Sequence, residues 1–294
     1  MYAHTMKREK NWKQKESKSV TEVPEEKFEH KKSLGQHFLN SDYAPRKMCD
    51  AADIIPGDVI FEIGPGTGAL TEVLLARGAT VIALEADVRA IEALNERFKN
   101  EINLGQLVIH HGDARYIDFK ALTLTDQKYK VVANIPYYIS GMLFRALLES
   151  DCQPTTLVFL VQKEVAARIA RDQKESLLSL SIKAFGTPRY VDTVTRGHFT
   201  PPPKVDSAII AVSAISKKSF ATFTQERFFK ILHLGFGQKR KQLLSNLSKS
   251  YSREFLTQVF TTMNLSLTIR AEDISIQNWL ILVEKLESPD ISPQ

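Results

Sequence analysis

The chain has 294 residues, 43% of them hydrophobic and 25% charged, with a net charge of +5 and a pI near 9.0. This is the composition of an ordinary globular protein with a sizeable core, and its mildly basic balance admits nucleic acid as a partner. No apolar run reaches the roughly eighteen residues of a membrane helix, and the two cysteines form no metal-ligand pattern. We therefore expect a cytoplasmic protein with reduced thiols, no membrane partner and no metal.

Residues 1–31 are rich in lysine and glutamate and contain few branched apolar residues. Such a segment cannot bury enough surface to order itself, so we expect a disordered tail. Its glutamates argue against a mitochondrial transit peptide, and it lacks the apolar core of a secretory signal. Residues 32–39 form the first segment that we expect to be ordered, and a helix over 43–52 follows it.

A glycine-rich turn then joins a strand to a helix. Residues 59–63 have the apolar, β-branched content of a buried parallel strand, and 69–77 are predicted to be helical. Between them, Gly64, Gly66 and Gly68 permit positive φ and leave room for a ligand beside the N–H groups of the helix N-terminus.

The next strand, 80–85, ends in a carboxylate. Glu85 lies about twenty residues after the first glycine, where a ribose diol would bind, so the pattern predicts a nucleoside site on a doubly wound sheet. It fits a dinucleotide and S-adenosylmethionine (SAM) equally. After a helix over 87–99 and a strand over 107–110, Asp113 follows at the same sheet edge, where we expect it to contact adenine.

A strand over 130–134 ends in a stiff polar corner. Pro136 fixes its own φ and biases Ile135 toward an extended conformation. The corner presents the amide of Asn134 and the carbonyl of Ile135 toward the cleft, with the aromatic face of Tyr137 beside them. Acceptors next to a flat ring suit an extruded base that carries an exocyclic amine.

The rest of the chain is predicted to hold three further strands of the sheet, a proline-rich loop and a helical end. We expect helices over 140–149, 162–172 and 176–185, strands over 155–161, 189–195 and 204–212, and C-terminal helices over 225–235, 240–249, 253–263 and 274–286. Phe199 precedes three consecutive prolines, 201–203, which hold the loop extended. Its ring either stacks on the target base, on the face opposite Tyr137, or fills the hydrophobic core. The two alternatives are about even.

Two groups of cations are candidates for RNA contacts. Lys163, Arg168 and Arg171 flank the proposed cleft, and Lys239, Arg240 and Lys241 open the helix expected over 240–249.

Six motifs in this order resemble the ribosomal RNA adenine dimethyltransferases, the KsgA/Erm group. They are Leu34–Leu39, Glu62–Thr71, Gly112–Ala114, Asn134–Tyr137, Gln162–Val165 and Phe199–Ser207. The resemblance implies an α/β fold: a Rossmann-like SAM-dependent methyltransferase domain over 32–215, with a seven-stranded, mostly parallel sheet, and a small all-helical RNA-binding domain over 216–294.

The resemblance also implies roles for single residues. SAM is expected at His37, Leu39, Gly64, Gly66, Glu85, Asp113, Ala114 and Asn134, and the catalytic set is Asn134, Ile135, Pro136, Tyr137 and Phe199. The first and last motifs are similar to the bacterial branch that dimethylates two adjacent adenines in the 3′-terminal hairpin loop of small-subunit rRNA. We accordingly expect a monomer that acts on the immature small (30S) subunit and has a role in its biogenesis.

Three other functions remain open. Ile135 stands where that branch commonly has leucine, and the isoleucine form is familiar from the Erm branch, which methylates large-subunit rRNA. A nicotinamide-dependent oxidoreductase fits the glycine turn and Glu85 but leaves the Asn134–Tyr137 corner unexplained. A non-catalytic RNA-binding or ribosome-assembly factor could also retain the fold.

Overall fold

The computed structural model describes residues 37–286. The expected tail and residues 32–36 of the first ordered segment lie outside the described residues. The strands are β1 (Phe38–Leu39), β2 (Val59–Ile63), β3 (Thr80–Glu85), β4 (Leu107–His111), β5 (Lys130–Asn134), β6 (Thr156–Gln162), β7 (Thr187–Val194), β8 (Phe199–Thr200) and β9 (Ser207–Ser213). The α-helices are α1 (Tyr43–Ala51), α2 (Ala69–Ala76), α3 (Val88–Arg97), α4 (Lys99–Asn103), α5 (Ser140–Leu148), α6 (Lys163–Ala170), α7 (Leu177–Lys183), α8 (Gln225–Gly235), α9 (Leu243–Leu247), α10 (Arg253–Thr262) and α11 (Ile276–Lys285).

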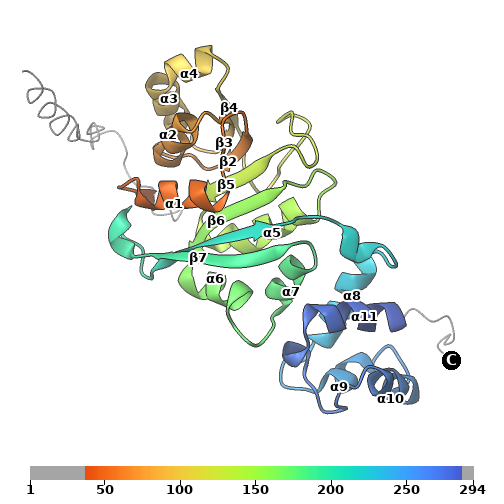
Figure 1. Ribbon diagram of the computed structural model, residues 1–294. Coiled ribbons are helices and arrows are strands. Elements are labelled where there is room, and N and C mark those ends of the chain that lie inside the picture. The colour runs from red at the N-terminus through yellow and green to blue at the C-terminus, as the bar shows by residue number, and fades with distance from the viewer. Residues whose placement is uncertain (1–36, 287–294) are drawn as a thin grey trace, which may run out of the picture. The chain divides into compact units, whose positions relative to one another are not determined.

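Seven strands form one sheet in the order β4-β3-β2-β5-β6-β9-β7 (Figure 1). All pairs from β4 to β6 are parallel, and β9 runs antiparallel to both β6 and β7. The expected seven-stranded, mostly parallel sheet is therefore confirmed. The chain leaves β2 toward β3 and β4 on one side and returns to β5 on the other. Ligands of such sheets bind at the carboxyl ends of the strands where this reversal occurs.

Alternate residues of the strands face two separate cores. In β2, Ile60 belongs to the core that includes α1, α2 and α3, whereas Phe61 belongs to the core that includes α5, α6 and α7. Both side chains are fully buried. A strand covered by helices on both faces must be apolar throughout, which is why residues 59–63 contain so few polar side chains.

The C-terminal helices α8 to α11 share the second of these cores. Phe228, Phe260 and Trp279 are fully buried in it, together with residues of the sheet. Phe185, two residues after α7, contacts Phe220 of the linker with ring centroids 4.9 Å apart. The sheet and the C-terminal helices thus belong to one compact unit, although the C-terminal part is all-helical as expected.

One predicted helix boundary is wrong. The helix expected over 240–249 begins only at Leu243, so the basic run before it lies in a turn. The buried side chain of Asn246 closes this turn, because its Nδ2 donates hydrogen bonds to the carbonyls of Gly235 (2.6 Å) and Gln238 (3.2 Å). The chain must loop back to reach that amide, and this prevents residues 239–241 from joining the helix.

Candidate functional site

The glycine turn leaves open space at one position and receives a ring at another. Gly64 has φ +67°, and a Cβ built on it would meet nothing within 4 Å. Gly66 has φ +56°, and a Cβ there would come within 2.9 Å of the Phe38 ring. The turn therefore requires glycine at both positions, and the space above Gly64 is free for a ligand.

Glu85 is held rigidly at the end of β3 with one acceptor position to spare. Its Oε2 accepts the N–H of Gly66 (3.1 Å), and its Oε1 accepts those of Ala86 (2.8 Å) and Asp87 (2.9 Å). A carboxylate offers about four lone-pair sites, so these three bonds leave room for one further donor. A ribose hydroxyl fits that position.

Asp113 follows β4 at the same edge of the sheet. It accepts the backbone N–H of Arg115 (2.8 Å), and its carboxylate pairs with the guanidinium of the same residue. These bonds lower the pKa of Asp113, the side-chain bond contributing most, so the carboxylate is ionised at neutral pH. The neighbouring Ala114 is half-buried and packs against the larger core.

Asn134 ends β5 with a defined amide orientation. Its Nδ2 donates to the backbone carbonyl of His37 (3.1 Å), and its Oδ1 makes no hydrogen bond with any other described residue. Because the donor end is occupied, the acceptor end is left for a ligand. The neighbouring Ile135 side chain is buried, at 2% exposure.

Tyr137 is fixed at both ends. Its hydroxyl is hydrogen-bonded to Ser207 Oγ at 2.6 Å, and its carbonyl accepts the hydroxyl of Ser140 (3.0 Å). The ring of His37 stacks on it with centroids 5.9 Å apart, and the Nδ1–H of His37 donates to the carbonyl of Pro201 (2.8 Å). His37 thus joins the first, fourth and last motifs, which are far apart in the chain.

Phe199 lies in the core. It pairs with Leu39 where β8 meets β1, and only 2% of it is exposed. Of the two alternatives drawn from the sequence, the structure matches the one in which the ring fills the hydrophobic core. In this arrangement the ring supports the site from inside the smaller core, and a stacking role would require it to leave that core.

Sequence reasoning missed the small β1–β8 sheet and the contact of Phe38 with Gly66. The only signal for the first was that Phe38-Leu39 ends the first motif and Phe199-Thr200 begins the last. Two-residue strands carry no periodicity that a sequence pattern can detect.

Comparison with known proteins identifies the family. A model of the family described as "Ribosomal RNA adenine dimethylase" matches residues 27–288. The chain belongs to the ribosomal RNA adenine dimethylase family. It is therefore an rRNA adenine-N6,N6-dimethyltransferase.

Named relatives cover most of this dimethyltransferase. The chain is 39% identical over 252 residues to ribosomal RNA small subunit methyltransferase A of Dehalococcoides mccartyi strain CBDB1, covering 85% of this chain and 86% of the relative. It is 34% identical over 265 residues to the protein of that name in Fusobacterium nucleatum, covering 88% and 98%.

Solved structures agree with the fold. A dimethyladenosine transferase from Plasmodium falciparum superposes with a TM-score of 0.71 at 27% identity, covering 84% of this chain and 96% of that one. The 23S rRNA methyltransferase ErmE superposes with a TM-score of 0.68 at 24% identity, covering 85% and 100%. The fold is that of the Rossmann-like, SAM-dependent methyltransferases.

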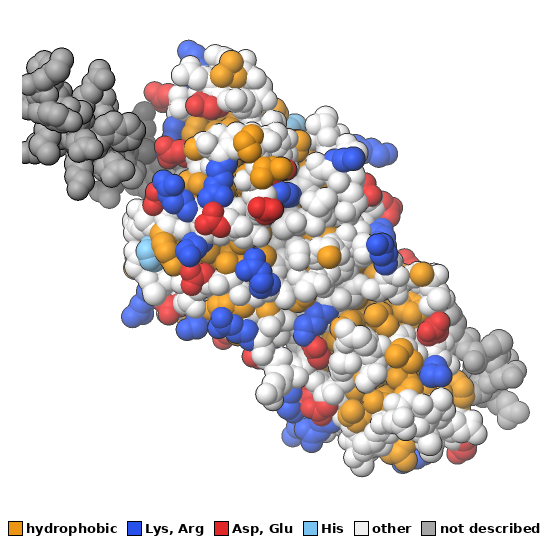
Figure 2. Space-filling model, in the orientation of Figure 1, with side chains coloured by type: hydrophobic (Ala, Val, Ile, Leu, Met, Phe, Trp, Pro, Cys, Tyr) orange, Lys and Arg blue, Asp and Glu red, His pale blue; other side chains and the backbone are white. Residues whose placement is uncertain are grey.

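The candidate RNA-binding cations of this dimethyltransferase come from two regions. Lys163, Arg168 and Arg171 are exposed in and just after α6, and the guanidinium of Arg171 lies 3.5 Å from the centroid of the Tyr190 ring. The other group, Lys239–Lys241, is exposed in the turn before α9. Figure 2 shows Lys and Arg interspersed with Asp and Glu on the visible face rather than gathered in one field.

The loop after α6 contacts the C-terminal region close to the turn at Lys239–Lys241. Lys174 pairs with Glu272 at 2.6 Å, and the N–H of Glu175 donates to the Glu272 carbonyl at 2.7 Å. The pKa of Glu272 is lowered by Lys174 above all, and also by Lys239 and Arg270. Lys174, in the loop after α6, and Lys239, in the turn before α9, therefore lie near the same carboxylate.

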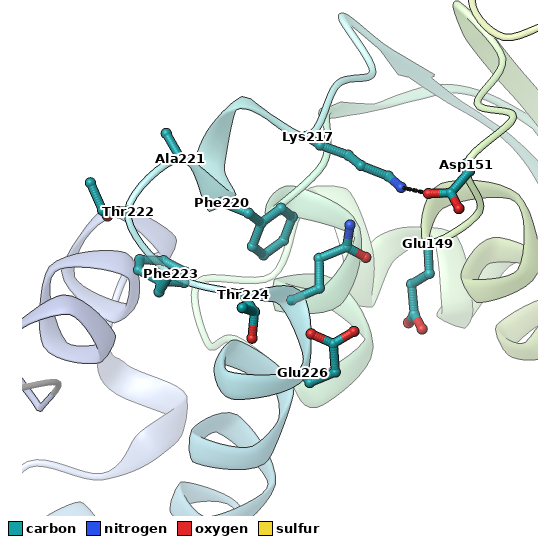
Figure 3. A pocket seen from close by; sticks show the side chains of 10 residues that line it. Glu149, Asp151, Lys217, Phe220, Ala221, Thr222, Phe223, Thr224 and Glu226 are labelled. Carbon is teal, nitrogen blue, oxygen red and sulfur yellow. Dashed lines mark hydrogen bonds and ion pairs between the residues drawn. The ribbon is translucent and has the colours of Figure 1, made fainter.

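A separate groove of about 730 Å³ lies where the end of α5 meets the linker to α8 (Figure 3). Glu149, Asp151 and Glu226 line it, with Phe220 on one wall, and Lys217 pairs with Asp151 at 2.6 Å. Three carboxylates against one paired lysine repel phosphate, so this groove is not part of the proposed RNA or cofactor site.

No helix within residues 37–286 combines the length and hydropathy needed to cross a membrane. No three His, Cys, Asp or Glu side chains in the same range are placed to hold a metal ion.

A buried acid beneath the glycine turn makes stability depend on pH. Burial raises the pKa of Glu62 from 4.5 to about 8; the hydrogen bond from the Thr71 hydroxyl (2.7 Å) opposes the rise and the charge of Glu85 adds to it. Unfolded chain loses this proton near pH 4.5, whereas folded protein keeps it to about pH 8. Folded protein thus binds more protons between these values, and stability falls as pH rises through them.

Glu62→Gln should remove this dependence, because glutamine accepts the Thr71 bond without titrating. Relative to the wild type, we expect the variant to gain free energy of unfolding as pH rises from about 5 to 8, by at most about 4 kcal/mol. Urea unfolding at several pH values measures this, with Glu92→Gln, an exposed change on α3, as control. Parallel pH profiles for the wild type and Glu62→Gln would show that Glu62 is already ionised in the folded state.

Proposed function

We propose that this enzyme transfers methyl groups from SAM to N6 of two adjacent adenosines in the 3′-terminal hairpin loop of small-subunit rRNA. It acts as a monomer on the immature small subunit in the cytoplasm and contributes to its biogenesis. The names of the relatives support the choice of ribosomal subunit. The observation that carries the chemistry is the orientation of Asn134, whose acceptor oxygen is free beside Tyr137.

The proposed cofactor site is the space along the glycine turn and the strand ends. Open space at Gly64 and the spare acceptor position of Glu85 suit the ribose of an adenosyl group. Asp113, with Ala114 beside it, lies where it would contact the adenine. Gly66 packs closely against the Phe38 ring, which borders the turn. The remaining proposed contacts are His37, Leu39 and Asn134.

The residues of the corner would act by positioning the amine. The lone pair of adenine N6 is delocalised into the ring, so the nitrogen is a weak nucleophile. The Asn134 side-chain oxygen and the Ile135 carbonyl accept the N6 hydrogens and direct the lone pair at the methyl group, which SAM supplies in electrophilic form. As the new N–C bond forms, the S–C bond breaks, and the surplus N6 proton passes to water. Asn134 cannot ionise, so positioning and electrostatics carry the rate.

Tyr137 would hold the base flat. One face of its ring is covered by His37, which leaves the other face for the adenine. Pro136, with φ −58° and ψ 130°, keeps the ring next to Asn134. Stacking of a base on an aromatic ring is worth roughly 1–3 kcal/mol.

A large-subunit substrate is the second candidate, because Ile135 matches the Erm form of the fourth motif. Its side chain is 2% exposed, however, and so cannot contact RNA directly. The test is to incubate the enzyme with labelled SAM and immature small or large subunits, and then to map the modified bases. Label on two adjacent adenosines near the 3′ end of small-subunit rRNA supports the proposal, and label confined to the large subunit contradicts it.

We also propose that residues 216–294 grip RNA through the turn at Lys239–Lys241, together with Lys163, Arg168 and Arg171. Replacing the three turn residues with glutamine should weaken rRNA binding and reduce the slope of log K against log salt by about 2, since each phosphate contact contributes about 0.7–0.9. Filter binding at several salt concentrations measures both quantities. The control removes the exposed Lys99, Lys120 and Lys128, which changes the charge equally. An identical loss in both triple variants would assign the effect to net charge alone.

A further inference from the structure

Two tyrosines at the edge of the candidate site expose most of their surface to solvent. Tyr138, directly after Tyr137 in η3 (Tyr137–Ile139), is 70% exposed, and Tyr116, three residues after Asp113, is 80% exposed. Neither ring contributes to the two cores. Large aromatic rings held in water beside a binding site are a common sign of a recognition surface.

Arg115 lies against Tyr116 and within electrostatic range of Tyr138. Its guanidinium carbon lies 5.8 Å from the centroid of the Tyr116 ring, and the guanidinium pairs with the Asp113 carboxylate. The pKa of Arg115 is raised, above all by Asp113 and to a lesser degree by Tyr116 and Tyr138. Both phenol rings thus lie within electrostatic reach of one planar cation. We call Arg115, Tyr116 and Tyr138 the aromatic ledge.

The composition of the ledge fits unpaired nucleotides better than a protein partner. Single-stranded RNA is bound by aromatic rings and arginine planes that stack on bases, with the positive charge facing the phosphates. A protein interface would need a larger continuous apolar patch, whereas these two rings alternate with a cation. The ledge is also continuous with the proposed site, because Tyr138 follows Tyr137 and Arg115 holds Asp113.

We propose that the aromatic ledge stacks the unpaired bases next to the target adenosine, so that one adenine enters the site while its neighbour rests on Tyr138 or Tyr116. This rests on the proposed function, since it takes the substrate to be an RNA loop with adjacent adenosines. The ledge would select loops whose bases are free to splay, and it would hold the second adenosine close by between the two rounds of methylation.

The test compares the full-length wild type with Tyr116→Ala/Tyr138→Ala and Tyr116→Phe/Tyr138→Phe. Methylation of immature small subunits gives KM for the particle and kcat, and fluorescence anisotropy gives the affinity for a short adenine-rich single-stranded RNA. For the alanine pair we expect KM to rise and RNA affinity to fall by about 10-fold or more, with kcat and SAM affinity within about twofold of the wild type. The phenylalanine pair keeps both rings and should behave as the wild type.

Leu104→Ala is the matched control, because Leu104 is 73% exposed and precedes β4, at the end of the strand away from Tyr116. Unchanged RNA affinity in the alanine pair, or an equal loss of affinity in the phenylalanine pair, would refute base stacking by the aromatic ledge. Neither result would contradict the proposed function. If the wild type failed to methylate small subunits, the proposed function would fail instead. The anisotropy arm would still decide whether the ledge binds single-stranded RNA.

Discussion

Asn134→Ala is expected to lower the turnover number by about 10²–10³-fold while the affinity for SAM stays within about threefold. The variant loses the Oδ1 acceptor that would hold the target amine, and removal of one preorganised polar group at a reacting atom typically costs this much. Steady-state methylation of small subunits measures the first quantity, and calorimetric titration with SAM measures the second.

Two further variants sharpen this test. Asn134→Asp keeps an acceptor oxygen but replaces the donor that faces the His37 carbonyl, so it isolates the effect of amide orientation. Asn103→Ala, an exposed change at the end of α4, should leave turnover unchanged. Turnover of Asn134→Ala within tenfold of the wild type would mean that the corner does not position the amine.

Glu85→Ala is expected to weaken SAM binding by about 100-fold. Hydrogen bonds to a charged acceptor contribute about 1.5–3 kcal/mol, and 1.4 kcal/mol corresponds to a factor of ten in affinity. The change also leaves the N–H groups of Gly66, Ala86 and Asp87 without their present acceptor, so the glycine turn would lose its shape. Calorimetric titration with SAM measures the loss.

The same lost bonds could unfold the alanine variant, so the thermal midpoint of each protein is measured alongside. Glu85→Gln has the same shape and no charge, and we expect it to bind SAM about 10-fold more weakly than the wild type. Asp118→Ala is the control, because Asp118 also accepts two backbone N–H groups, those of Lys120 and Ala121, but is exposed to solvent. A folded Glu85→Gln protein with wild-type affinity would remove Glu85 from the proposed cofactor site.

Much of the fold could be predicted because its signals are local. The bounds of β2, β3 and β5 match the expected strands, since each is a short apolar run that ends at a glycine or a polar corner. Asp87, the first residue of the helix expected over 87–99, caps α3 by accepting the N–H of Arg89. The basic turn before α9 could not be predicted, because the Asn246 side chain that closes it lies on the helix that follows.

Some residues of the candidate site could likewise be predicted from the sequence, and others could not. Gly64, Glu85 and Asn134 could be chosen from the sequence because their residue types and positions after strands already limit their chemistry. The two partners of Tyr137 could not be chosen in this way. His37, which stacks on its ring, lies 100 residues before it, and Ser207, which bonds its hydroxyl, lies 70 residues after it.

The sequence by itself determined the sheet, the glycine turn, the polar corner and the family, since strand periodicity, turn chemistry and motif spacing are properties of neighbouring residues. Only the tertiary structure decided that Phe199 is buried, that the Asn134 amide points its donor at His37, and that Tyr116 and Tyr138 stand exposed, with the Arg115 guanidinium next to Tyr116. A hydrophobic or polar pattern states which kind of environment a side chain needs. Which distant residue provides that environment is settled by packing, because one apolar surface can be buried against many others of similar free energy.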